Sequence, residues 1–129
     1  MSDDKLRNEL RKIFIEEIND QFTTYIVKPR MPYRNRHWDE DTPFEKKVEI
    51  MFKGRFFYGC NHRYKKGKIF FDHDFTDRLA MLRNFHITVK ELAEALGWQY
   101  IDDTKDGRDY AVVSYDDFVK FLAGTNNQN

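Results

Sequence analysis

The chain has 129 residues, of which 40% are apolar and 16% aromatic; this composition suits one folded domain and excludes a disordered chain. Basic and acidic side chains balance at 22 each, no apolar run is long enough to cross a bilayer, and a single cysteine excludes an internal disulfide framework. With no signal peptide at the acidic N-terminus, we expect a cytoplasmic protein without a membrane segment.

The balanced net charge conceals an uneven distribution along the chain. Residues 28–70 carry twelve basic and five acidic side chains, a net charge of +7. Residues 87–129 carry four basic and eight acidic side chains, a net charge of −4. The sequence therefore predicts one basic and one acidic surface.

The first predicted element is an amphipathic helix. Apolar residues recur at three- and four-residue steps from Leu6 to Tyr25, and Ser2 or Asp3 can cap the start. Two prolines then interrupt the helical pattern, so we expect an ordered loop over residues 28–41.

A second helix is predicted after this loop. Thr42 is placed to cap it, with Pro43 at the first helical position and Glu45 completing a capping box. Gly54 is expected to end it. A strand over residues 48–52 is the weaker alternative.

Runs rich in aromatic and β-branched residues predict two β-hairpins. The first joins residues 55–64 to 68–71 through a Lys-Lys-Gly turn, and the second joins residues 98–101 to 110–113.

Two helices are expected between the hairpins. The first begins at Asp74 or Thr76 and carries an apolar stripe made of Phe75, Leu79, Leu82 and Phe85. The second begins with a capping box from Thr88 to Glu91 and ends at Gly97.

The last predicted helix begins after Ser114 and ends at Gly124. Residues 125–129 are expected to form a disordered tail. The order of elements predicts a single α+β domain over residues 1–124, with antiparallel hairpins packed with about five helices.

Residues 85–122 carry a family resemblance. The segment 87–97 is similar to a helix-turn-helix element, residues 106–110 resemble a wing, and residues 115–122 resemble the closing helix of excisionase-like or winged helix-turn-helix proteins. The resemblance implies a DNA-binding architecture. However, the helix from Val89 and the wing both carry more acidic than basic side chains, so we expect any nucleic acid on the basic middle segment instead.

The basic middle segment contains the candidate site residues. Cationic side chains gain affinity for phosphates by counterion release, and exposed aromatic rings stack on unpaired bases, although the same rings also serve as core residues. The candidate nucleic-acid or partner-binding residues are Arg30, Tyr33, Arg34, Arg36, Trp38, Arg63, Lys65, Lys66 and Lys68.

These features predict a small non-enzymatic protein that binds nucleic acid, and they fit an accessory or regulatory protein of a phage or mobile element. The alternative is a protein-interaction module or inhibitor that binds and blocks a partner protein. In that case the acidic C-terminal third would imitate a nucleic acid, or the basic middle would dock on an acidic partner.

Metal and catalytic chemistry are less well supported by the sequence. Cys60, His62 and His73 could approach one another, but a structural zinc site needs four ligands and the chain has no second cysteine. No phosphate-binding loop, nucleophile elbow or dinucleotide fingerprint is present. We therefore predict no metal site, no cofactor and no catalytic residues.

Overall fold

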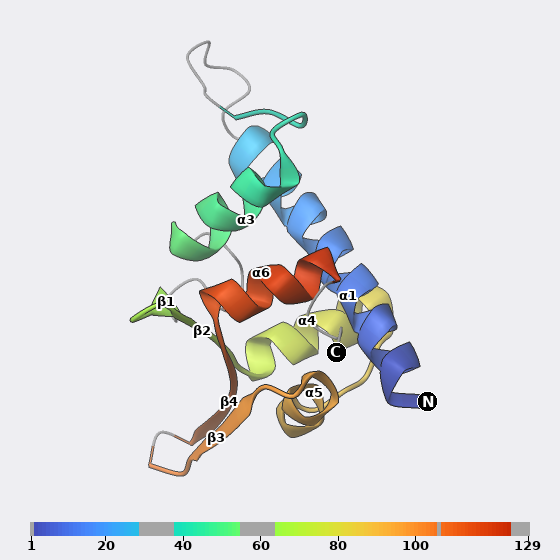
Figure 1. The fold of residues 1–129 in the computed structure, drawn as a ribbon, viewed down its shortest axis with the longest axis vertical. Coiled ribbons are helices and arrows are strands. Elements are labelled where there is room, and N and C mark those ends of the chain that lie inside the picture. The colour runs from blue at the N-terminus through green and yellow to red at the C-terminus, as the bar shows by residue number, and fades with distance from the viewer. Residues whose placement is uncertain (1, 29–37, 55–63, 106, 125–129) are drawn as a thin grey trace.

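The structure is a computed structural model that describes residues 2–28, 38–54, 64–105 and 107–124. Within these residues a four-stranded antiparallel sheet packs with helices, which confirms the predicted α+β class (Figure 1). The predicted tail over 125–129 lies outside the described residues. The elements are α1 (Ser2–Gln21), the π-helix η1 (Phe22–Val27), α3 (Phe44–Lys53), β1 (Tyr64–Lys65), β2 (Lys68–Phe71), α4 (His73–Arg83), α5 (Val89–Leu96), β3 (Gln99–Asp103), β4 (Arg108–Ser114) and α6 (Tyr115–Ala123).

The N-terminal helix is α-helical only as far as Gln21. Leu10, Phe14 and Ile18 are fully buried, as their spacing predicts. From residue 22 the chain becomes a π-helix, whose i→i+5 hydrogen bonds change which positions face the core. Tyr25, predicted on the apolar stripe, is therefore 49% exposed, whereas the two residues that follow it are buried.

Helix α3 forms as predicted, but its start differs. No side chain caps the helix, and Pro43 occupies the N-cap position. The predicted capping box is therefore wrong, because the hydroxyl of Thr42 instead accepts a hydrogen bond of 3.0 Å from the backbone N–H of Asp39. The helix ends at Gly54, as predicted.

The two hairpins share one sheet, in the order β1-β2-β4-β3. Ile69 and Phe71 of β2 lie opposite Val113 and Ala111 of β4, and all four belong to the hydrophobic core. The second hairpin is confirmed and is longer than predicted. Of the first hairpin, the predicted stretch 55–63 lies outside the described residues.

Helix α4 begins earlier than predicted. Its N-cap is Asp72, which accepts a hydrogen bond of 3.0 Å from the backbone N–H of Asp74, so the predicted caps Asp74 and Thr76 are wrong. Leu82 of the predicted stripe is 54% exposed, whereas Phe75 and Leu79 are fully buried.

The predicted starts of α5 and α6 are confirmed. Thr88 and Glu91 form the reciprocal capping box, and Ser114 accepts a hydrogen bond from the backbone N–H of Asp117. Both helices end at glycines in the left-handed region, also as predicted.

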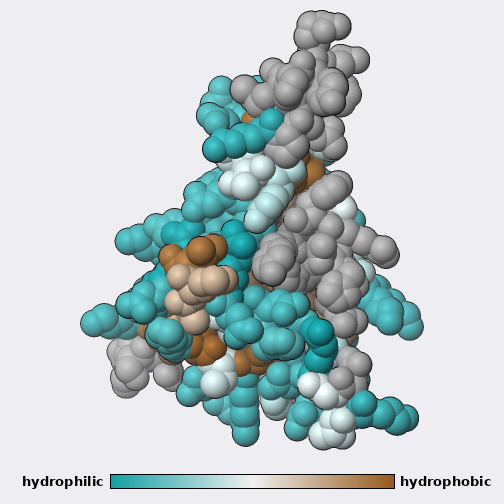
Figure 2. All heavy atoms as spheres, turned by 180° about the vertical axis from the view of Figure 1, so that it is seen from behind, coloured by the Kyte–Doolittle hydropathy of each residue, from teal (hydrophilic) through white to brown (hydrophobic). Residues whose placement is uncertain are grey.

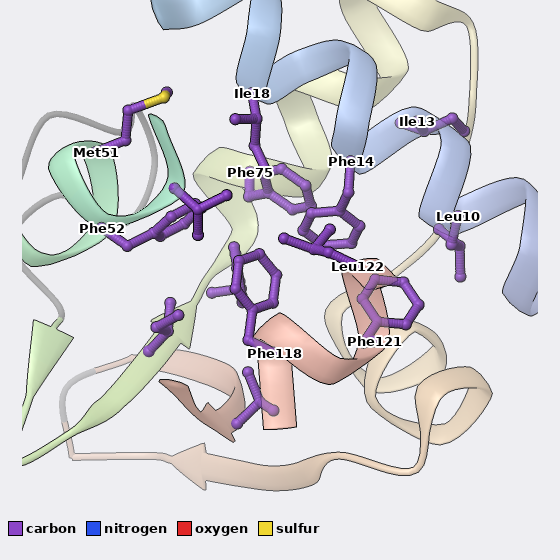
Figure 3. Packing of buried hydrophobic residues seen from close by; sticks show 14 of the residues in the cluster. Leu10, Ile13, Phe14, Ile18, Met51, Phe52, Phe75, Phe118, Phe121 and Leu122 are labelled. Atoms are coloured by element: carbon purple, nitrogen blue, oxygen red, sulfur yellow. The ribbon is translucent and has the colours of Figure 1, made fainter. Parts of the chain in front are cut away.

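The core gathers around Phe14 of α1, whose ring contacts those of several aromatic residues. The ring of Phe75 stacks on it at 4.9 Å, and Phe118 and Phe121 of α6 meet it edge-on at 5.6 Å (Figure 3). Helix α1 thus packs against α6 and also contacts α3 and α5 (Figure 1). Among the described residues, no helix combines the length and the apolar character that a membrane span requires.

Candidate functional site

A tight turn between β1 and β2 presents three lysines. Lys66 and Gly67 both have positive φ, 53° and 78°, as a type I′ hairpin turn requires. Lys65 and Lys68 are direct cross-strand partners, and Lys66 lies between them at the tip. All three lysines are exposed, and none forms an ion pair with a described residue.

The turn is fixed to the first residue of α6. The backbone N–H of Tyr115 donates a hydrogen bond of 2.8 Å to the carbonyl oxygen of Gly67. The ring of Tyr115 also lies 4.4 Å from Nζ of Lys53 and 6.2 Å, edge-on, from the ring of Tyr64. We call this group the lysine corner; it comprises Lys53, Tyr64, Lys65, Lys66, Lys68 and Tyr115.

Tyr115 is neutral at physiological pH. Burial, followed by the charges of Glu49 and its other neighbours, raises the pKa of this phenol to about 12. The corner therefore combines lysine ammonium groups with the neutral ring of Tyr115, and the carboxylates of Glu49 and Asp116 lie near that ring.

An acidic pair lies at the other end of β4, whereas Asp116 and Asp117 lie in the first turn of α6, beside the lysine corner. Asp102 of β3 lies directly opposite Asp109 of β4, and the hydroxyl of Tyr100 donates a hydrogen bond of 2.7 Å to Asp109. This hydrogen bond is the main reason why the pKa of Tyr100 is raised to about 12. Because β4 runs from Arg108 to Ser114, the acidic end and the lysine corner are about 20 Å apart at the usual rise per strand residue.

The structure brings together part of the predicted site. Lys65, Lys66 and Lys68 gather in the lysine corner, whereas Trp38 is half-buried and packs against the core. The other predicted residues lie outside the described residues: Arg30, Tyr33, Arg34, Arg36 and Arg63. Tyr115 was missed, because its position in the corner depends on a contact between segments far apart in sequence.

A buried ionic cluster joins α1 to α4. The carboxylate of Glu17, 1% exposed, accepts hydrogen bonds from Nε of Arg78 at 2.7 Å and Nε of Arg83 at 2.9 Å. Arg83 also pairs with Glu16 and Asp20. The sequence pattern did not predict this cluster, although Glu17 follows Phe14 by three residues and therefore lies on the apolar face of the helix.

An exposed apolar area lies near this cluster. Met81 and Leu82 of α4 are 76% and 54% exposed, and Leu82 lines a hollow of about 540 Å³ together with Arg78 and Arg83. Figure 2 shows a compact hydrophobic area on the rear face, surrounded by hydrophilic side chains.

Possible metal ligands occur at the start of α4. The ligand atoms of His73, Asp74 and Asp77 lie within 4.8 Å of one another, and the guanidinium of Arg108 is 3.9 Å from Asp74. This cation competes for the carboxylate, so the group lacks the concentrated negative charge that favours a bound cation. Cys60 and His62, considered with His73 as metal ligands in the sequence analysis, lie outside the described residues.

Comparison with known proteins finds no matching family model, no matching curated protein and no matching solved structure.

Proposed function

We propose that the chain is a non-enzymatic binding protein that contacts nucleic acid through the lysine corner. The observation that carries this proposal is the type I′ turn, which presents three exposed lysines beside Lys53 and Tyr115. Lysine ammonium groups neutralise phosphates and release their counterions. Tyr64 and Tyr115 are partly exposed, so their rings are available for contact with a base or sugar.

Charge supports the lysine corner over α5 as the contact surface. Helices α4 and α5 are separated only by residues 84–88 and are followed by the β3–β4 hairpin, an arrangement compatible with the helix-turn-helix resemblance. However, the exposed charged side chains of α5 are Lys90, Glu91 and Glu94, so phosphates are repelled there. At the lysine corner, by contrast, four lysines outnumber the nearby Glu49, Asp116 and Asp117, and the Asp102–Asp109 pair is at the opposite end of β4.

The test is a fluorescence-anisotropy titration with single- and double-stranded DNA and RNA over a salt series. Three to four lysine–phosphate contacts predict a slope of log K against log salt of about −2 to −4. The Lys65→Glu/Lys66→Glu/Lys68→Glu variant should lose binding.

A matched control separates a local site from a general charge effect. The Lys5→Glu/Lys12→Glu/Lys90→Glu variant changes the net charge by the same amount at three exposed lysines outside the corner. It should bind within about threefold of the unaltered protein, the small loss reflecting only long-range repulsion. Equal losses in both variants, or no binding at low salt, would refute the proposal.

A further inference from the structure

A groove between α3 and α6 adjoins the lysine corner at one end. The two helices lie side by side (Figure 1), and the groove between them has a volume of about 380 Å³. Lys53 and Tyr115 lie at one end, and the walls continue along both helices to Phe44 on α3 and Leu122 on α6.

The walls of the groove are mainly apolar. Phe44 and Val48 contribute from α3, and Val119, Leu122 and Ala123 contribute from α6. Val48 and Leu122 are buried, whereas Phe44 and Val119 remain partly exposed, so the groove opens to solvent above a closed floor. A volume of this size lies within the roughly 300–1,000 Å³ that is usual for sites taking apolar groups.

One edge of the groove is acidic. Glu45 and Glu49 lie four residues apart on α3, so both carboxylates project from the same edge, and both residues are exposed. Oε1 of Glu49 lies 3.5 Å from Nζ of Lys46, in an exposed ion pair that contributes little to stability. A phosphate chain would be repelled from this edge, and a cationic side chain would be attracted.

We propose that this groove docks an amphipathic helix of a partner protein, with apolar side chains in the groove and Lys or Arg side chains along Glu45 and Glu49. A helix that inserts its apolar face between two helices is an established mode of peptide recognition. The acidic edge then selects a basic partner, because complementary charge attracts the right partner and repels the wrong one. This proposal does not require nucleic-acid binding, although the groove and the lysine corner share Lys53 and Tyr115.

Two labelled 14-residue peptides probe the groove: LKKLLKLLKKLLKL, with a basic polar face, and LEELLELLEELLEL, with an acidic one. Fluorescence anisotropy should show that the basic peptide binds at least tenfold more tightly than the acidic one. The Glu45→Lys/Glu49→Lys variant should reduce this ratio at least tenfold. Both substitutions are at exposed positions, so circular dichroism should confirm an unchanged fold.

The control variant is Glu9→Lys/Glu94→Lys, which makes the same change in net charge at two exposed acidic residues outside the groove. Its ratio of affinities for the basic and acidic peptides should stay within twofold of that of the unaltered protein. Amide chemical shifts of the unaltered protein should change mainly along α3 and α6 when the basic peptide is added, and Val119→Asp should weaken binding by removing an apolar wall contact.

The proposal is overturned if neither peptide binds, if both variants change the ratio equally, or if the shift changes map elsewhere. Nucleic-acid binding is also measured on the Glu45→Lys/Glu49→Lys variant, to distinguish failure of this proposal from failure of the proposed nucleic-acid binding. It should not weaken, because the substitution adds positive charge near the lysine corner.

Discussion

Nε of Arg78 donates a hydrogen bond of 2.7 Å to Oε1 of Glu17, joining α4 to α1 across 61 positions of the chain. The carboxylate is 1% exposed, and the Arg78 side chain is 14% exposed. The other carboxylate oxygen of Glu17 accepts from Arg83, so each oxygen of this buried anion has a cationic donor.

Replacing Glu17 with Gln should lower the free energy of unfolding by about 3 kcal/mol, because both guanidinium groups lose the buried charge that compensates them. Urea denaturation followed by circular dichroism measures the change. Glu16→Gln is the matched control: its side chain is 45% exposed, and its loss should cost less than about 1 kcal/mol. Equal effects of the two substitutions would contradict a special role for the buried carboxylate.

The same cluster predicts how stability depends on pH. Burial raises the pKa of Glu17, but hydrogen bonds from Arg78, Gln21 and Arg83 outweigh it, so the pKa lies below its ordinary value of 4.5. A carboxyl whose pKa is lower in the folded state stabilises the fold fully above its unfolded-state pKa and loses this contribution as the pH falls. The stability difference between the unaltered protein and Glu17→Gln should therefore shrink below about pH 4.5. Urea titrations at pH 7, 5, 4 and 3 test this; a constant difference would be the contrary result.

Substitution of Lys66 in the turn of the lysine corner should have opposite effects on stability and on nucleic-acid binding. Asn tolerates the positive φ of Lys66 better than Lys does, and Asn-Gly is the preferred pair for a type I′ turn. Lys66→Asn should raise the free energy of unfolding by about 0.5 kcal/mol. It should also reduce the magnitude of the salt slope for nucleic acid by about 0.7 to 0.9, the loss of one phosphate contact.

The control for this prediction is Lys66→Gln, which removes the same charge without relieving the backbone. It should weaken binding equally and leave stability unchanged. If Lys66→Asn keeps the full salt slope, Lys66 does not contact phosphate.

Asp72 contributes to stability in two ways that substitutions can separate: as the cap of α4 and as the partner of Arg108. This fully buried carboxylate caps α4 and accepts a hydrogen bond of 2.7 Å from Nη1 of Arg108. Asp72→Ala should lower the free energy of unfolding by about 3 kcal/mol, since both interactions are lost. Asp72→Asn keeps a capping oxygen and should cost about 1 kcal/mol less.

Thermal and urea denaturation of both variants measure these changes, with Asp74→Ala as the control. Asp74 is 42% exposed and 3.9 Å from Arg108, so its removal should cost under about 1 kcal/mol. A cost for Asp72→Ala as small as that of Asp74→Ala would contradict the assigned role.

Local sequence signals predicted the elements that depend on local chemistry. The capping box of Thr88 and Glu91 lies within four residues, so the sequence alone was sufficient to locate the start of α5. At α4 the prediction was Asp74 or Thr76, whereas the structure uses Asp72, which also pairs with Arg108, 36 positions away.

The parts of the fold and site that escaped prediction depend on long-range packing. The pairing of β2 with β4 joins two hairpins that each looked complete in the sequence. Tyr115 appeared as an ordinary residue of a helix, yet its backbone fixes the lysine turn and its ring contacts Lys53. Such contacts leave no periodic or motif signal in the chain.

The lysines of the β1–β2 turn and the Asp102–Asp109 pair lie at opposite ends of β4, so this strand separates opposite charges by about 20 Å. In the field of a polyanion, charges separated in this way contribute a torque that turns the lysine turn toward the polyanion and the Asp102–Asp109 pair away from it. Encounters are thereby oriented without the non-specific attraction that a net positive charge would bring. Added salt shortens the range of this alignment, since screening acts over about 8 Å at physiological ionic strength.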